Sequence, residues 1–449
     1  MTLTASGRLS ADLRKCTSTV GVTITRAAGY AAVSLLALLS PVFEGGSLVA
    51  FALVAIVGAV ATDGPVFDFF ADRGEFKNRR LLGLIEYAIA ASVLAAGVVL
   101  NLIPVELFAG TVLLVGFGYF GAEMARLVRS DRLTETTGFI TIGFMAFAVG
   151  HLAGTGLSDA DPAAVGTLAM AGALMGALFR AVVWARHDGL MMLVLAVILG
   201  GLLLLPFPSV EIVGLAIVIS IILAYLALMI GVASVAGMAT GVLMVFLTIV
   251  YGGLEWVTML IAFFGIGGIA TKYRYVDKRS RGVAEANRGA RGTGNVLGNT
   301  LVALAAVIGY AAVTGEQSAQ LFFSFAFAGA LATALSDTLS SEFGSLYDNP
   351  LLITSLDRVA PGTDGAVTLP GTVAGAIGAG LIAALFVAFG PAGLIGGFVI
   401  LAAGTVGMLV DSMLGAVIEG EVIGNHGVNA MATLAGASIA AVGALIGLV

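Results

Sequence analysis

The chain is dominated by long apolar runs that follow one another with short polar gaps. From Val210 to Tyr273, three such runs succeed each other with almost no polar residues between them. No charged residue occurs between Ala366 and Val410. A helix needs about 20 apolar residues to cross a bilayer, and helices satisfy their own backbone hydrogen bonds in lipid. The pattern therefore predicts a bundle of membrane-spanning helices and excludes soluble folds.

The composition is consistent with a membrane bundle. Only 11% of the residues are charged, against roughly 25% in soluble domains, and the mean hydropathy is +1.06. The 62 glycines are compatible with membrane helices that approach each other closely. The single cysteine, Cys16, excludes a disulfide within the chain and a Cys-rich metal site. The net charge of −6 gives no support for nucleic-acid binding.

The apolar runs predict an all-α, polytopic integral membrane protein of about 14 transmembrane helices. Residues 1–26 are polar and mixed, and they predict an exposed N-terminal tail with no cleavable signal. We divide the remainder into an N-terminal membrane domain, residues 27–209, and a C-terminal membrane domain, residues 210–449, which contains the conspicuous polar blocks. Runs of sufficient or nearly sufficient length begin near residues 27, 47, 81, 105, 137, 163, 189, 210, 233, 254, 295, 319, 368, 391 and 429.

The longest polar gap, residues 271–295, is strongly basic. Short loops rich in Lys and Arg remain in the cytoplasm, so this loop predicts a plasma-membrane protein with its active-site loops on the cytoplasmic side. Two predicted spans separate it from the polar gap at 344–372, and two more lead to residues 419–429. All three loops should then meet on one face. The cations of the first gap are Lys272, Arg274, Lys278, Arg279, Arg281, Arg288 and Arg291.

The N-terminal membrane domain repeats this order of features only loosely. An acid at a predicted helix end, a basic loop, a Thr-Gly stretch and a His-Gly stretch follow one another between residues 123 and 189. A decayed internal duplication would leave this order, as in many membrane carriers. We assign no function to this domain.

Asp337 interrupts a long uncharged stretch. A charged side chain at the centre of a membrane helix costs about 2.5–3.5 kcal/mol, and such residues usually mark function. On a helix, Asp337, Ser341 and Gly344 share one face. This polar stripe could hold a cation or lie against a phosphate. The alternative is an ordinary helix end at the membrane surface.

Asp411 repeats the pattern of Asp337. It follows the uncharged stretch that ends at Val410, with Ser412 beside it and Gly415 one turn later. Two carboxylates on two helices are what a magnesium–phosphate site needs, because Mg²⁺ takes oxygen ligands and keeps substrate phosphates in its shell. The sequence therefore predicts that Asp337 and Asp411 bind Mg²⁺ together.

The segment "PGTDGAVTLPGT", residues 361–372, stands directly before a predicted helix. Backbone N–H groups and Thr hydroxyls at a helix N-terminus form an anion site. Asp364 within it would fix the turn or touch a metal. The alternative is an ordinary loop in which Thr372 caps the helix.

Two further blocks contribute candidate side chains. His426 lies in "GNHGVN" with Asn429 after it, and histidine can move a proton or donate to a phosphate. Arg358 is the sole Lys or Arg after Arg291. The positive charge that a nucleoside triphosphate requires would therefore come from metal, Arg358, and Arg288 or Arg291.

Six blocks, in this order, resemble the transmembrane-protein-nineteen-like family, which includes plant phytyl-phosphate kinase. The resemblance covers roughly residues 225–449. More distantly, the layout is similar to CTP-dependent polyprenol kinases and CDP-diacylglycerol synthases, although this chain lacks the lysines that those kinases place near the Gly-Thr loop. The blocks are "GLEWVTMLIAFFGIGGIATKYR", "GARGTGNVLGNTLVALAA", "SDTLSSEFG", "GTDGAVTLPGTVAG", "DSMLGAVIEG" and "NHGVNAMATLAG".

The resemblance implies a membrane kinase that transfers the terminal phosphate of CTP to an isoprenoid monophosphate such as phytyl or geranylgeranyl phosphate. It also implies that Asp337 and Asp411 hold Mg²⁺ and that His426 and Asn429 close the pocket. Cytidylyl transfer that makes a CDP-linked lipid and secondary transport are the alternatives. The residues implied to surround the phosphates are Arg291, Asn295, Asn299, Gly362, Thr363, Gly365, Thr368, Gly371 and Thr372.

Overall fold

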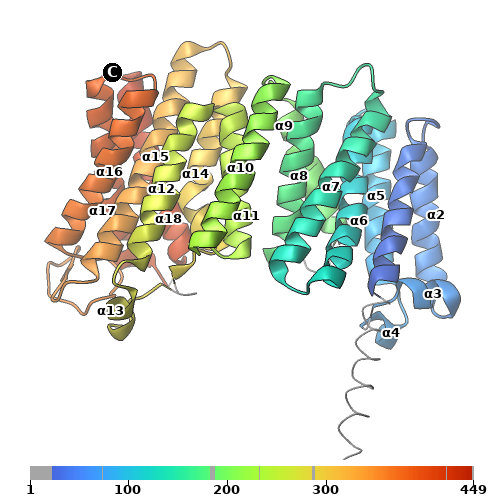
Figure 1. Cartoon of the computed structure of the whole chain (residues 1–449), viewed down its shortest axis with the longest axis horizontal. Helices are drawn as coiled ribbons and strands as arrows, with labels where there is room; N and C mark the ends of the chain where they lie inside the picture. Colours follow the sequence, from blue (N-terminus) through green and yellow to red (C-terminus); the bar gives the residue numbers. More distant parts are fainter. Residues whose placement is uncertain are drawn as a thin grey trace, which may run out of the picture. The chain divides into compact units, whose positions relative to one another are not determined.

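The computed structural model describes residues 23–72, 74–182, 188–231, 233–285, 289–420 and 422–446 (Figure 1). The described chain is almost entirely helical, which confirms the predicted all-α membrane fold. It separates into two compact units, one ending at Leu204 and one starting at Leu205. Each unit has its own core, and each is described separately.

Unit 1 is a helical bundle that opens with the apolar helix Thr23–Leu39, of which Leu35–Leu39 is a 3₁₀ turn. The axes of α2 and α3 differ by 103°, so this pair is a broken span or a re-entrant segment. The elements are α2 (Gly46–Val60), α3 (Gly64–Phe70), α4 (Glu75–Asn78), α5 (Leu82–Val99), α6 (Val105–Val128), α7 (Arg132–Thr155), α8 (Pro162–Val182) and α9 (Asp188–Leu203).

Helices α6 and α7 pack most closely in unit 1, and glycine makes this contact. A Cβ atom added at Gly121 would lie 2.5 Å from the carbonyl oxygen of Gly138 on the facing helix. Small residues allow membrane helices to approach until their backbones touch. Neither glycine can therefore carry a larger side chain without separating the pair.

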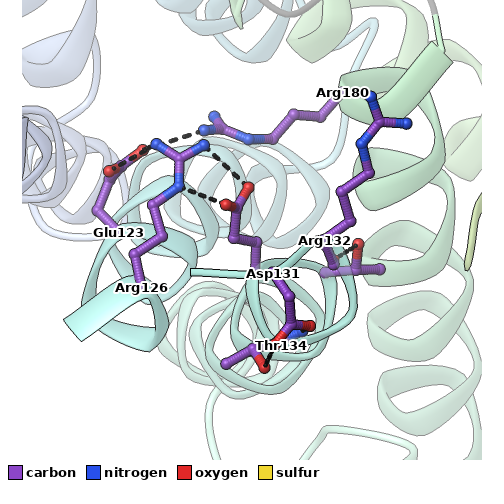
Figure 2. Close-up of polar contacts among 8 residues, drawn as sticks. Glu123, Arg126, Asp131, Arg132, Thr134 and Arg180 are labelled. Carbon is purple, nitrogen blue, oxygen red and sulfur yellow. Dashed lines mark hydrogen bonds and ion pairs between the residues drawn. The ribbon is translucent and has the colours of Figure 1, made fainter. Parts of the chain in front are cut away.

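A network of ion pairs joins α6, α7 and α8 at one end of unit 1, and Figure 2 shows Arg126 and Arg180 reaching Glu123. Arg126 Nη1 lies 2.9 Å from Glu123 Oε1, and Arg180 Nη2 lies 3.3 Å from the same oxygen. Arg126 Nε also pairs with Glu135 of α7 at 2.7 Å. The guanidinium carbon of Arg180 lies 4.6 Å from the ring centre of Tyr119. One carboxylate therefore serves arginines of two helices.

We expect Glu123→Gln to destabilise unit 1 by about 2 kcal/mol, because a buried hydrogen-bonded charge is lost and its two arginines remain. The Glu123 side chain is only 4% exposed, so water cannot replace it. Thermal unfolding of the protein in detergent measures the change. Asp159→Asn, at an exposed loop acid, is the matched control. Equal melting temperatures for the two variants would contradict a stabilising role of the network.

Unit 2 surrounds α15, which packs against α12, α14, α16, α17 and α18. Its two short strands pair antiparallel, with Leu351 opposite Val367, in the connection between α15 and α16. The elements are α10 (Val210–Ile230), α11 (Val235–Tyr251), α12 (Leu254–Lys272), α13 (Tyr275–Ser280), α14 (Thr293–Ala312), α15 (Gln317–Gly344), β1 (Leu351–Leu352), β2 (Ala366–Val367), α16 (Leu369–Phe389), α17 (Leu394–Ile418) and α18 (Asn425–Leu445).

Six helices of unit 2 bring their polar termini to one end. Helices α12, α15 and α17 finish there, and α14, α16 and α18 begin there, because residues at these termini line one cavity. Figure 1 shows α13 beyond the ends of the long helices, on the side where the α15–α16 connection also lies. The three polar loops of the sequence thus meet at one end of the unit.

The predicted count of 14 spans is not confirmed. Among the described residues, 11 helices are long and apolar enough to cross a membrane, or up to 12 if the α2–α3 pair is one span. Three further apolar runs form helices of 10–17 residues: Thr23–Leu39, Gly189–Leu203 and Val235–Tyr251. Apolar runs in the sequence continue into loops and turns, so run length overestimates helix length.

Candidate active site

A cavity of about 460 Å³ opens at this polar end of unit 2. Its volume is in the range of small-ligand pockets. Most of the predicted site residues line it, although they come from distant parts of the sequence. These are Arg291, Asn295, Asn299, Asp337, Ser341, Gly362, Thr363, Asp364, Gly365, Thr368, Asp411 and Asn429.

Asp337 and Asp411 contact each other through their carboxyl groups. Each lies about two turns before the end of its helix, α15 or α17, which corresponds to about 10 Å. Both side chains are partly exposed because they face the cavity. The structure thus places the two acids at the same depth and side by side.

Two asparagines on neighbouring helices form a hydrogen-bonded chain that reaches Asp411. In the amide orientation that matches donors to acceptors, Asn429 of α18 donates to Asp411 Oδ1 at 3.3 Å. Its oxygen accepts from Asn299 Nδ2 of α14 at 3.0 Å. Asn299 and Asn429 are 3% and 8% exposed. This chain of buried amides fixes the position of Asp411.

Arg291 lies against Gly267 and Phe263 of α12. Its Nη2 lies only 2.6 Å from where a Cβ of Gly267 would be, and its guanidinium carbon is 4.9 Å from the ring centre of Phe263. Nη2 donates to the hydroxyl of Thr338 at 3.3 Å. Burial lowers the pKa of Arg291, and the carboxylates of Glu342, Glu285 and Asp337 oppose this effect.

Arg291 also has an unused donor. Its Nη1 is buried and has no hydrogen-bond partner within the described chain. Buried polar groups are almost always paired, so this nitrogen indicates a binding partner that enters from outside. Because a guanidinium forms strong paired hydrogen bonds with phosphate, the cavity is equipped to receive an anion.

A second buried cation, Lys278 of α13, forms an ion pair with a residue of the cavity lining. Its side chain is 1% exposed, and its Nζ donates to Glu342 Oε2 at 2.5 Å and to the carbonyl oxygen of Ala270 at 2.9 Å. Glu342 lines the cavity. The pair therefore fixes the basic loop to the ends of both α12 and α15.

The Gly-Thr loop packs tightly against α17. A Cβ at Gly365 would lie 2.6 Å from the carbonyl oxygen of Ser412, and the φ angle of Gly365 is +75°. Only glycine tolerates both conditions easily. Thr368 caps α16 by accepting from the N–H of Gly371 at 3.1 Å. Thr368, the residue that caps α16, thereby joins Gly365 in the lining of the cavity.

The lining is strongly acidic. Burial raises the pKa of Glu419 at the end of α17, and the neighbouring carboxylates of Asp364 and Asp337 raise it further. Arg291 is the sole cation among the described lining residues, against six acids: Glu285, Asp337, Glu342, Asp364, Asp411 and Glu419. The net negative charge of the lining therefore favours binding of an anion together with a cation.

These donors fit Mg²⁺, which is commonly held by one or two carboxylates together with substrate phosphates. The described residues contain no group of three or more His, Cys, Asp or Glu arranged to hold a metal by themselves. The two adjoining carboxylates would be ligands for a metal ion, and the unpartnered Nη1 of Arg291 would donate to a phosphate oxygen.

Four predicted residues lie away from the cavity, and a fifth is not described. His426 is exposed and rests against Gly294 and Gly298 of α14. Arg358 is exposed in the α15–α16 connection. Gly371 packs on Gly344, and Thr372 donates to the carbonyl oxygen of Thr368 at 3.0 Å. Arg288 lies outside the described residues.

The structure adds lining residues that the sequence did not single out as site residues, chiefly Glu342, Glu419 and Asn425. Asn425 stands four residues before Asn429 and therefore shares its helix face, which was a usable signal. Glu419 directly follows the end of α17. The polar gap at residues 419–429 had already predicted that the helix of Asp411 ends there. Nothing in the sequence pairs Glu342 with Lys278.

Fold and cavity together define an all-helical integral membrane protein with a polar, carboxylate-rich pocket at one end of its second unit. The chain belongs to the DUF92 family of integral membrane proteins, which matches residues 218–439. This confirms the family resemblance seen in the sequence.

Each of three curated relatives matches less than half of this chain. An uncharacterized membrane protein of Synechocystis is 35% identical over 203 residues, which are 43% of this chain and 76% of the relative. One of Methanocaldococcus jannaschii is 34% identical over 44% of this chain and 79% of its own. Protein VTE6, chloroplastic, of Arabidopsis thaliana is 34% identical over 34% of this chain and 45% of its own. No solved structure matches.

Proposed function

We propose that this protein is a prenyl-phosphate kinase that transfers the terminal phosphate of CTP to an isoprenoid monophosphate such as phytyl or geranylgeranyl phosphate. The observation that carries the proposal is the meeting of Asp337, Asp411 and the unpartnered Arg291 Nη1 in one cavity. The family resemblance supplies the substrate class. A membrane protein is also suited to an acceptor with a long apolar tail.

In the proposed reaction, an oxygen of the lipid monophosphate attacks the γ-phosphorus of CTP. The bond from that phosphorus to the bridging β–γ oxygen breaks, and CDP leaves with the electron pair. A phosphate oxygen is already ionised at neutral pH, so no general base is needed. This agrees with the position of His426 outside the cavity. Such transfers depend almost entirely on positioning and charge neutralisation.

In this proposal, different residues of the cavity bind phosphate, hold the metal ion and position these groups. Arg291 Nη1 binds a phosphate oxygen, and Thr338 and Phe263 hold its guanidinium in place. Asn299 and Asn429 orient Asp411. Asp337 and Asp411 would hold Mg²⁺, which supplies positive charge to the phosphate oxygens when it is bound.

We further propose a plasma-membrane location with the cavity facing the cytoplasm, where nucleotides are available. Among the residues that the structure describes, the Lys and Arg residues of unit 2 lie in segments at the cavity end. The connections at the opposite end, residues 251–254, 312–317 and 389–394, contain no Lys or Arg. Positively charged loops remain on the cytoplasmic side.

Secondary transport is less consistent with this geometry. Transporters bind their substrates near the bilayer midplane, whereas Asp337 and Asp411 lie about 10 Å from the ends of their helices. Cytidylyl transfer, with attack at the α-phosphate, would use the same phosphate and metal ligands. Product analysis separates it from the kinase reaction.

The test is a turnover assay with the full-length protein in lipid vesicles. The protein is given Mg²⁺, CTP labelled at the γ-phosphate, and phytyl or geranylgeranyl monophosphate. We expect the label to appear in a lipid diphosphate. Labelled pyrophosphate together with an unlabelled CDP-lipid would overturn the proposal in favour of cytidylyl transfer. No consumption of CTP by folded protein would overturn both reactions and favour transport.

A further inference from the structure

The apolar residues of the cavity lining share one structural origin. Every lining residue contributed by a helix is polar or glycine, including Asn299, Asp337, Ser341 and Asp411. The apolar lining residues all come from the segments between helices. We call these apolar residues the rim: Val283, Ala284, Tyr347, Pro350, Pro361 and Ala366.

Contacts between its three segments hold the rim together. A Cβ at Gly362 would lie 2.8 Å from Val283 Cγ1, so the Gly-Thr loop touches the segment after α13. Arg281 Nη1 forms an ion pair at 2.8 Å with Asp348 Oδ1, next to Tyr347. The N–H of Tyr347 donates to the carbonyl oxygen of Gly344 at 3.1 Å, which anchors it to the end of α15. The rim is therefore a positioned feature of the cavity.

Tyr347 is the one aromatic residue of the described lining, and it is 50% exposed. Apolar groups in the lining of an acidic cavity need an explanation, because the polar helix residues of the lining, which we call the floor, suit a purely polar ligand. A polyphosphate satisfies the floor alone. A ligand that joins a polyphosphate to a flat group with apolar faces satisfies both parts, and a nucleotide is such a ligand.

We propose that the rim is the nucleobase-binding subsite, with Tyr347 stacking on the base. This inference rests on the proposed function, because it requires a nucleotide in the cavity. Stacking on an aromatic side chain contributes substantially to the binding of a base. An isoprenoid tail does not suit the rim, since the rim belongs to connections beyond the helix ends and not to the helix faces that lipid covers.

The experiment compares CTP with inorganic tripolyphosphate, which lacks the base and ribose. Binding of both to the full-length protein in Mg²⁺-containing buffer is measured by calorimetry, for wild type, Tyr347→Ala and Tyr347→Phe. We expect the alanine variant to bind CTP about tenfold or more weakly and tripolyphosphate as the wild type does. The phenylalanine variant, which retains the ring, should bind both normally. Tyr225→Ala, at an exposed tyrosine of α10 outside the cavity, controls for general effects of losing a surface ring.

The outcomes separate the subsite from the function. If wild type binds CTP no better than tripolyphosphate, or if Tyr347→Ala weakens both ligands equally, the nucleobase subsite is overturned and the polyphosphate site stands. If wild type binds neither ligand, the proposed kinase function fails as well. Weak CTP binding by both Tyr347 variants would show that the hydroxyl, and not the ring, is the binding group, and would overturn the stacking proposal.

Discussion

Asp337→Asn and Asp411→Asn are each expected to reduce phosphate transfer at least about 1,000-fold. A bound divalent cation contributes several kcal/mol of charge stabilisation in reactions of this type, and each substitution removes one of its two proposed carboxylate ligands. The amide retains the size and most of the hydrogen bonding of the acid. Because the two carboxyl groups already contact each other, loss of one charge should not destabilise the fold.

The measurement is the CTP turnover assay at saturating Mg²⁺, with thermal unfolding as the check on folding. Asp357→Asn provides the matched control, since Asp357 is an exposed acid of the α15–α16 connection that does not line the cavity. We expect this control to retain wild-type activity. Near-normal turnover by a folded Asp337 or Asp411 variant would exclude that residue as a required metal ligand.

The membrane fold was predictable because a bilayer restricts a chain to few solutions. Long apolar runs such as Val210–Ile230 can only be helices in lipid, and the structure has this helix. Span number was less predictable, since it depends on where each helix ends. The run that begins near residue 47 breaks at the bend between α2 and α3, and hydropathy alone gives no sign of such a bend.

Much of the candidate site was also visible in the sequence. A carboxylate in an apolar helix is costly, so Asp337 and Asp411 stood out without any knowledge of the fold. Helical periodicity predicted that Ser341 and Gly344 share a helix face with Asp337. The structure places both residues in the same cavity as Asp337. Periodicity assigns residues to a helix face, and in this protein the polar faces converge.

Residues in loops and at glycine contacts were harder to assign. Gly371 and Thr372 looked like phosphate ligands because they stand in a Gly-Thr stretch. The structure shows Gly371 packed on Gly344 and Thr372 bonded to its own helix. His426 likewise faces Gly294 and not the cavity. Sequence spacing alone does not tell which residues of the first helical turn line the cavity.

The buried pair of Lys278 and Glu342 was not predictable, because the two residues are far apart in the sequence and each resembles an ordinary loop or helix-end charge. We expect Lys278→Met to destabilise the protein by about 3–5 kcal/mol, since it leaves the Glu342 carboxylate buried without its cation. It also removes the donor to the carbonyl oxygens of Ala270 and Thr271. Thermal unfolding in detergent measures the loss. Arg279→Met, at the adjacent exposed arginine, should change stability little.

The double variant Lys278→Met, Glu342→Leu shows what the pair contributes beyond stability. Replacing a buried ion pair by apolar residues of similar volume is often neutral or stabilising, so the double variant should recover most of the stability that the single variant loses. If Glu342 only balances the charge of Lys278, turnover by the double variant should recover together with its stability. If Glu342 also shapes the cavity that it lines, the double variant will be stable but will have low turnover. A single Lys278→Met variant as stable as wild type would contradict the buried pair itself.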